Sequence, residues 1–185
     1  MIFDCFGVLT TEGFRSFCHK YMSGEPGSVT KAQQAMDQLN VGLISLDDFI
    51  KTLAELSGQS AAVVGEHLDK NTPNEELFEY IRWILKPQLK IGMLSNAGAD
   101  WLSEMFESKD LELFDDKLLS FEVKIKKPDQ GIYLLSAQRL GVEPSECIFV
   151  DDIHSYCEGA RAVGMKAIWY QNFEDMKLEL DRISK

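Results

Sequence analysis

The segment Met1-Ile2-Phe3-Asp4-Cys5-Phe6-Gly7-Val8-Leu9-Thr10 decides how this chain folds. Three apolar residues lead into a carboxylate, and a turn that contains glycine follows directly. This is the pattern of a buried strand that ends in a charged side chain. Because a buried carboxylate is costly unless it is paired or bound to something, Asp4 is the first candidate for a functional residue.

Polar side chains stand in the same position after two later apolar segments. Cys147-Ile148-Phe149-Val150 runs into Asp151-Asp152, and Ile91-Gly92-Met93-Leu94 runs into Ser95-Asn96. A fourth signal is Lys127-Pro128, where the proline fixes the start of the next helix and aims the preceding lysine. Ligands of parallel α/β sheets bind at the carboxyl ends of the strands, so we expect these residues to converge.

From residue 89 onward, short apolar segments alternate with amphipathic ones. Strands that alternate with helices favour βαβ units, and hence an α/β fold with a parallel sheet covered on both faces. The predicted strands are 90–94, 119–123, 147–150 and 166–170, and the predicted helices are 100–107, 130–140, 155–163 and 173–183.

Between residues 11 and 87 the periodicity is helical throughout. Because this helical block is inserted directly after the first strand, it should lie over the strand ends as a lid. We therefore predict a core domain of residues 1–11 and 87–185 and a cap domain of residues 12–86. Its helices are predicted near 14–21, 30–39, 46–57, 61–68 and 75–85, with Ser45 as the N-cap and Gly58 as the stop of the third.

The composition is that of an ordinary globular protein, with 185 residues, 45% hydrophobic and 26% charged. A formal net charge of -11 disfavours nucleic acid and anionic membranes as partners. No apolar run approaches the ~20 residues of a membrane span, and no secretory signal pattern is visible. Four cysteines without C-x-x-C spacing and only three histidines argue against zinc. Reduced cysteines indicate a cytoplasmic location.

The residue types at the strand ends suit one kind of chemistry. Asp4, Asp151 and Asp152 at one sheet edge would repel one another, and hard oxygen ligands of this kind point to Mg²⁺. The alternative is that Asp151-Asp152 caps the helix that begins near Ser155. Lys127 near Asp4 would lower the pKa of that carboxyl and neutralise a bound anion.

Ser95-Asn96 supplies a hydroxyl and backbone amides that can bind phosphate oxygens, although the same dipeptide also suits a plain turn or N-cap. Of the neighbouring lysines, Lys124 and Lys126 are expected on a solvated face. A carboxylate nucleophile, a divalent cation, a lysine and a hydroxyl together suit phosphoryl transfer.

These four segments, in this order, resemble the four motifs of the haloacid dehalogenase (HAD) superfamily. The helical insert is similar to the small α-helical cap of subfamily I. The resemblance implies a three-layer α/β/α Rossmann-like core with the first strand at the centre of the sheet. The segments that resemble the four motifs are residues 3–9, 94–96, 127–129 and 149–152. Ile132-Tyr133 follows the third segment in the sequence, and Glu158-Gly159-Ala160 and Gly164 follow the fourth.

For function, the resemblance implies a Mg²⁺-dependent phosphatase that acts on a small phosphorylated metabolite through an aspartyl-phosphate on Asp4. Lys127 would be the second catalytic residue. The implied metal ligands are Asp4, the backbone carbonyl of Phe6, Asp152 and, in support, Asp151. The implied substrate-binding residues are Ser95, Asn96 and Lys127.

Two positions depart from the family pattern. Most phosphatases of the family carry a second Asp, used as general acid and base, where this chain has Phe6. An Asn often seen four residues after the metal Asp is Tyr156 here. Phe6 predicts a slow enzyme or one selective for good leaving groups. It also leaves two alternatives open: a metal-independent 2-haloacid dehalogenase, and a catalytically weak domain with a binding or regulatory role.

Substrate choice would lie with the cap, and cap motion with the two crossings near Thr10-Thr11 and Lys86-Pro87. Trp83 and Trp101 are interpreted as packing residues. The polar candidates of the cap are Arg15, His19, Lys20 and Asn40, each of which also suits an ordinary surface position.

Overall fold

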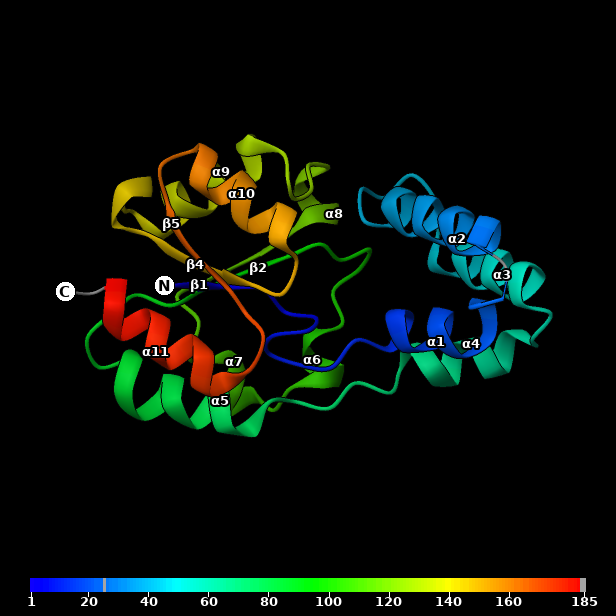
Figure 1. Cartoon of the computed structure of the whole chain (residues 1–185), viewed down its shortest axis with the longest axis horizontal. Helices are drawn as coiled ribbons and strands as arrows, with labels where there is room; N and C mark the ends of the chain where they lie inside the picture. The colour runs from blue at the N-terminus through cyan, green and yellow to red at the C-terminus, as the bar shows by residue number, and fades with distance from the viewer. Residues whose placement is uncertain (25, 184–185) are drawn as a thin grey trace.

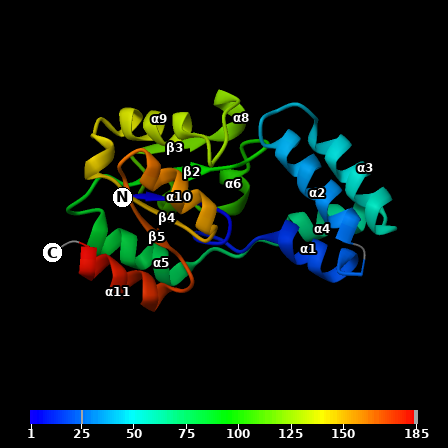
Figure 2. The same ribbon diagram turned by 45° about the horizontal axis from the view of Figure 1, so that its top comes forward.

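The sheet has five parallel strands with β1 at its centre, as the resemblance implied. A computed structural model describes residues 1–24 and 26–183. The strand order is β3-β2-β1-β4-β5 (Figures 1 and 2), and Phe3 is aligned between Met93 and Val150. The strands are β1 (Ile2–Phe3), β2 (Gly92–Ser95), β3 (Asp116–Leu119), β4 (Ile148–Asp151) and β5 (Lys166–Trp169).

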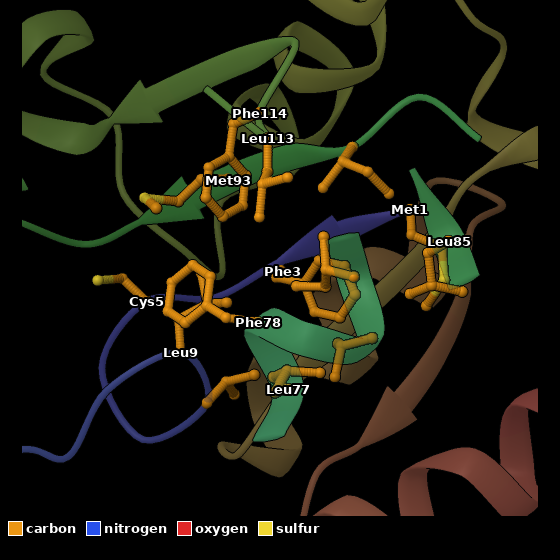
Figure 3. Packing of buried hydrophobic residues seen from close by; sticks show 14 of the residues in the cluster. Met1, Phe3, Cys5, Leu9, Leu77, Phe78, Leu85, Met93, Leu113 and Phe114 are labelled. Carbon is orange, nitrogen blue, oxygen red and sulfur yellow. The ribbon is translucent and has the colours of Figure 1, made fainter. Parts of the chain in front are cut away.

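Alternating side chains place apolar groups on both faces of this sheet. Ile2, Leu94 and Phe149 belong to one buried cluster, which α9 (Gln130–Leu140) and α10 (His154–Ala162) cover. Phe3 points to the opposite face, where Figure 3 shows it with Met93 beside Leu77 and Phe78. That second face is covered by α5 (Glu75–Tyr80), the π-helix η1 (Ile81–Leu85) and α11 (Phe173–Ile183) (Figure 1).

Four helices form a separate cap with a hydrophobic cluster of their own around Phe17, Phe49 and Leu53. They lie together beyond the carboxyl edge of the sheet in both Figures 1 and 2. Ser45 caps the third helix by accepting a hydrogen bond from the Asp48 N–H, and Gly58 ends it with a left-handed φ of 68°, as predicted. The helices are α1 (Gly13–Met22), α2 (Pro26–Leu39), α3 (Leu46–Ser57) and α4 (Ala61–Leu68).

The boundary between cap and core differs from the prediction. The predicted cap ended at residue 86, but α5 packs against the sheet because Leu77 and Phe78 are buried beneath Phe3 (Figure 3). The chain returns to the core earlier, at Thr72, whose N–H donates to Thr11 Oγ1 at 2.8 Å while the Thr11 N–H donates to the Thr72 carbonyl at 3.1 Å. The two crossings therefore lie side by side at Thr11 and Thr72, and the expected crossing at Lys86-Pro87 is wrong.

The predicted strand over residues 119–123 is also wrong. The strand is β3, because Asp116 to Leu119 pair with β2. Ser120 then turns the chain into the short helix α8 (Ser120–Val123): its buried hydroxyl accepts from the Ala97 N–H and donates to the Asn40 carbonyl.

The remaining short elements connect the larger ones. The predicted helix over 100–107 is shorter than expected, with the Asp100 carboxylate accepting from the Leu102 N–H at its start. Trp83 is exposed rather than packed, and its indole N–H donates to Glu79. No described helix is long and apolar enough to cross a membrane. The short elements are α6 (Leu102–Met105), α7 (Ser108–Leu111) and the 3₁₀ helix η2 (Pro144–Glu146).

Candidate active site

Three carboxylates meet at the carboxyl edge of the sheet. Asp4 directly follows β1, Asp151 is the last residue of β4, and Asp152 follows it. One oxygen from each carboxylate lies within 4.8 Å of the other two. Asp4 and Asp151 are buried, and Asp152 is half-buried. The pairing of β1 with β4 brings these side chains together from opposite ends of the chain.

Helix capping does not account for the two aspartates of β4. The N-cap residue of α10 is Ile153, and no side chain caps that helix. Asp151 Oδ1 accepts from the Ile153 N–H at 2.8 Å, which fixes the carboxylate but leaves its second oxygen facing the site. The capping alternative is therefore wrong, and the two carboxylates are available for other chemistry.

Lys127 lies between two of these carboxylates. Its Nζ donates to Asp4 Oδ1 at 2.6 Å and to Asp151 Oδ2 at 2.7 Å, and the side chain is fully buried. The rings of Phe149 and Tyr156 lie with their centroids 5.3 and 5.2 Å from Nζ, close enough for favourable cation–π contact. Lys127 is therefore held by ion pairs and by aromatic faces at the same time.

Burial and repulsion set the charge state of this cluster. Burial raises the pKa of Asp4 well above its usual value, and the Asp151 charge adds to this rise. The expected lowering by Lys127 is present but is outweighed. Burial likewise raises the pKa of Asp151. Burial alone would lower the pKa of Lys127, but the two carboxylates outweigh it and raise that pKa, so the lysine stays charged. Three carboxylates beside one lysine favour a further cation.

Asn96 holds the backbone of Lys127 in place. Its Oδ1 accepts from the Lys127 N–H at 2.8 Å, and its Nδ2 donates to the Lys127 carbonyl at 3.0 Å. The same Nδ2 lies 3.3 Å from the hydroxyl oxygen of Tyr156. The geometry gives Asn96 a positioning role, and it shows a use for Tyr156 that the sequence did not suggest, because the contact spans three separate segments.

Ser95 ends β2, the strand next to β1, and its side chain is almost fully buried. Within the described part of the chain its hydroxyl has no hydrogen-bond partner. A buried hydroxyl without a partner is costly, so a bound anion at this edge would relieve that cost. Ser95 therefore stays a candidate for the phosphate-binding role that the sequence predicted.

The residues around Asp152 suit a divalent cation. Asp152 Oδ1 is buried and finds no partner among the residues that the structure describes. Gly7 has φ +89°, and a Cβ there would lie 2.5 Å from Asp152 Oδ2, so only glycine lets this carboxylate approach the turn that carries Phe6. Carboxylate and carbonyl oxygens are the ligands that Mg²⁺ prefers. The donor set therefore fits Mg²⁺.

A family model for haloacid dehalogenase-like hydrolases matches residues 1–164. The chain belongs to this family. A phosphorylated carbohydrates phosphatase of Thermotoga maritima is 29% identical over 126 residues, which cover 68% of this chain and 56% of that protein. An (S)-2-haloacid dehalogenase of Pseudomonas sp. (strain YL) is 30% identical over 109 residues, covering 56% of this chain and 47% of that one. The chain spans about half the length of these curated relatives.

Solved HAD structures share the whole fold. A HAD family enzyme from Bacteroides thetaiotaomicron superposes with a TM-score of 0.73 at 21% identity, covering 97% of this chain and 96% of that one. The same enzyme has been crystallised with magnesium and inorganic phosphate, and that form superposes with a TM-score of 0.69. At this identity the likeness shows the fold, and the family match shows that the chain is a HAD hydrolase.

The residue that departs most from the HAD pattern, Phe6, lines a cavity between cap and core. This cavity has a volume of about 500 Å³, and Asp4, Lys127 and Asn96 also border it. The ring of Phe6 meets Trp101 edge-on, with centroids 6.2 Å apart. Trp101 itself packs against the hydrophobic cluster of the cap. An aromatic wall therefore stands beside Asp4 where most HAD phosphatases carry a carboxylate.

The polar cap candidates of this HAD chain separate into two groups. Arg15 and Asn40 border the cavity, and Arg15 also donates to Asp152 Oδ2 at 2.8 Å. His19 and Lys20 are exposed and lie away from it; the Lys20 Nζ lies 3.5 Å from the His67 ring nitrogen Nε2. The sequence offered no signal that separated these four, because their distance from Asp4 depends on how the cap sits over the sheet.

Proposed function

We propose that this chain is a Mg²⁺-dependent phosphatase that hydrolyses small phosphoric monoesters by transferring the phosphoryl group to Asp4. The observation that carries the proposal is the cluster of Asp4, Asp151 and Asp152 around the buried Lys127. A nucleophilic carboxylate alone would not need the second and third acid. Their mutual repulsion is relieved by a divalent cation and makes the site suited to an anionic phosphoryl group.

In this scheme the chain's own residues divide the work. The Asp4 oxygen that does not accept from Lys127 attacks phosphorus; the new Asp4–phosphorus bond forms as the bond to the leaving oxygen breaks. Water then cleaves the aspartyl-phosphate and releases inorganic phosphate. Lys127 and the Ser95 hydroxyl stabilise the charge on the transferring group. The bound cation, held by Asp4, the Phe6 carbonyl and Asp152, would supply charge neutralisation for the same group.

Phe6 limits which esters such a site can turn over. No carboxylate stands at this position to protonate the leaving oxygen, and acid–base assistance is typically worth ~10²–10⁴-fold. The leaving group must therefore depart as a stable anion. We expect aryl and acyl phosphates to be better substrates than alkyl phosphates, and rates to fall steeply as the leaving-group pKa rises. The phosphorylated carbohydrates that the Thermotoga relative is named for would be slow substrates here.

The decisive experiment is phosphate release from para-nitrophenyl phosphate with Mg²⁺ and with EDTA, beside Asp4→Asn. Release that requires Mg²⁺ and disappears in the variant supports the proposal. If metal has no effect while chloride is released from 2-chloropropionate in EDTA, the chain is a dehalogenase, the alternative that Phe6 and the Pseudomonas relative favour. If neither product forms while phosphate binds, the domain has a binding role.

A further inference from the structure

The cavity beside Asp4 has mostly apolar walls. Phe6 and Trp101 border it on the core side, next to the nucleophile. The cap completes the enclosure with large apolar side chains from α1, α2 and α3. Among them are Phe14, Met36, Leu39 and Phe49.

Most polar side chains of the cap that border this cavity already have partners inside the protein. Asn71 accepts from the Gly13 N–H and donates to the Leu68 carbonyl. Glu12 pairs with Arg15, which in turn pairs with Asp152. Asn71 and Arg15 cannot bind a substrate hydroxyl without giving up a bond that holds the cap together or to the core.

Asn40 is a neutral side chain without such a partner in the described part of the chain. It is 6% exposed and borders the cavity, yet its side-chain amide makes no hydrogen bond to any residue that the structure describes. Its backbone carbonyl accepts from the Ser120 hydroxyl at 2.6 Å, which ties the end of α2 to the core and fixes where the amide lies. Asn40 is therefore a rigidly placed, nearly buried group with a free donor and a free acceptor.

The charges at the rim restrict the ligand further. Asp69 and Glu104 border the cavity, are exposed, and form no ion pair within the described residues. A second anionic group on the ligand would face these carboxylates, while its phosphate lies at Lys127. The part of the ligand that fills the cavity must therefore be uncharged or cationic.

We propose that the substrate of this site is an aryl monophosphate whose aromatic body carries one hydrogen-bonding group for Asn40. The inference rests on the proposed phosphatase function. A sugar phosphate would bring several hydroxyls against mostly apolar walls, and each unpaired hydroxyl weakens binding. An aromatic body buries apolar surface against Phe6 and Trp101 instead. Its phenolic oxygen also leaves without an acid, as Phe6 requires.

Binding and turnover test this proposal separately. Affinities are measured on Asp4→Asn, which holds ligands without consuming them, for 1-naphthyl phosphate, its hydroxyl-substituted isomers and glucose 6-phosphate. We expect 1-naphthyl phosphate to bind at least 10-fold more tightly than glucose 6-phosphate. At least one hydroxyl isomer should bind about 2- to 10-fold more tightly still, the range for one hydrogen bond.

Adding Asn40→Leu should abolish the advantage of the hydroxyl isomer and leave 1-naphthyl phosphate within about twofold, which also shows that the double variant is folded. Gln38→Leu, which removes an exposed amide in the last turn of α2 just before Asn40, is the matched control and should change neither affinity. Equal or tighter binding of glucose 6-phosphate, or a hydroxyl advantage that survives Asn40→Leu, overturns the proposal.

Hydrolysis of acetyl phosphate by the unmodified protein reports the phosphatase reaction alone, because its acyl group is too small to fill the cavity. If phosphate is released from acetyl phosphate with Mg²⁺ but 1-naphthyl phosphate does not bind preferentially, the proposed reaction is right and the proposed substrate class is wrong. No release from acetyl phosphate or 1-naphthyl phosphate means that the proposed function is wrong, and with it the assignment of an aryl substrate.

Discussion

The guanidinium of Arg15, on cap helix α1, donates to Oδ2 of Asp152, on the core, at 2.8 Å. Glu12 holds the same guanidinium from the other side, with a carboxylate oxygen 2.8 Å from Nε. The cap therefore places a positive charge on the carboxylate that we assign to Mg²⁺. Contact with the cap and cation binding therefore compete for the carboxylate of Asp152.

We expect Arg15→Gln to strengthen divalent-cation binding. Removing the guanidinium frees Asp152 Oδ2, and because Arg15 is largely exposed its ion pair is worth only about 0.2–1 kcal/mol, or about 1.5- to 5-fold in affinity. Mn²⁺ titration followed by electron paramagnetic resonance measures this directly. Lys20→Gln removes a charge from the same helix away from the site and is the control. An equal shift in both variants would mean that only the overall charge matters.

Asp4→Asn should stabilise the metal-free protein at neutral pH. Burial and Asp151 raise the pKa of Asp4, so the folded state keeps a proton that the unfolded chain releases at about pH 4. The stability of the unmodified protein therefore falls as the pH rises from about 4 toward the raised pKa, whereas asparagine carries no such penalty. Urea denaturation in EDTA between pH 4 and 8 should show a gain for the variant that grows with pH.

In the presence of Mg²⁺ the unmodified protein should be more stable than Asp4→Asn, because only the unmodified protein keeps its full set of carboxylate ligands. If the variant gains the same free energy of unfolding at pH 4 and at pH 8, packing and not charge would explain its greater stability.

Lys127→Met should both destabilise the fold and abolish activity. The change leaves the Asp151 carboxylate buried without its cation and the Asp4 carboxyl without its hydrogen-bond donor, and breaking a buried ion pair from one side costs about 3–5 kcal/mol. Urea denaturation at pH 7 measures the loss, and Mg²⁺ should restore part of it. Lys126→Met is the matched control, since Lys126 pairs with Asp37 near the surface and should cost less than about 1 kcal/mol. Similar losses in both variants would contradict the role given to Lys127.

Phe6→Asp should raise turnover of alkyl phosphates with little effect on acetyl phosphate. A carboxylic acid at this position can protonate a poor leaving group. We expect the turnover rate to rise by about 10- to 100-fold, at or below the lower limit of acid–base assistance, because the contact with Trp101 is lost. Phe6→Asn makes the same space without the acid. If both variants gain equally, relief of crowding explains the change; the dependence of rate on leaving-group pKa distinguishes the two.

The sequence by itself determined which side chains lie at the sheet edge and the kind of fold that displays them. Asp4, Ser95 and Asp151-Asp152 each lie at the end of a short apolar segment, and the carboxyl ends of parallel strands share one edge. Lys127 was indicated by the proline that follows it. The sequence also predicted the two caps of α3, which are Ser45 and Gly58, because capping depends on a few neighbouring residues. Signals of this kind need no knowledge of distant segments.

Tertiary structure decided everything that depends on which segments meet. The periodicity of α5 suits a cap helix as well as a core helix, and only the space beneath Phe3 assigns it to the core. The register of β3 follows from its pairing with β2 rather than from its own residues. Arg15 and Asn40 look like surface residues in the sequence; the seating of the cap puts one on Asp152 and the other in the cavity wall, because contacts between domains leave no local pattern.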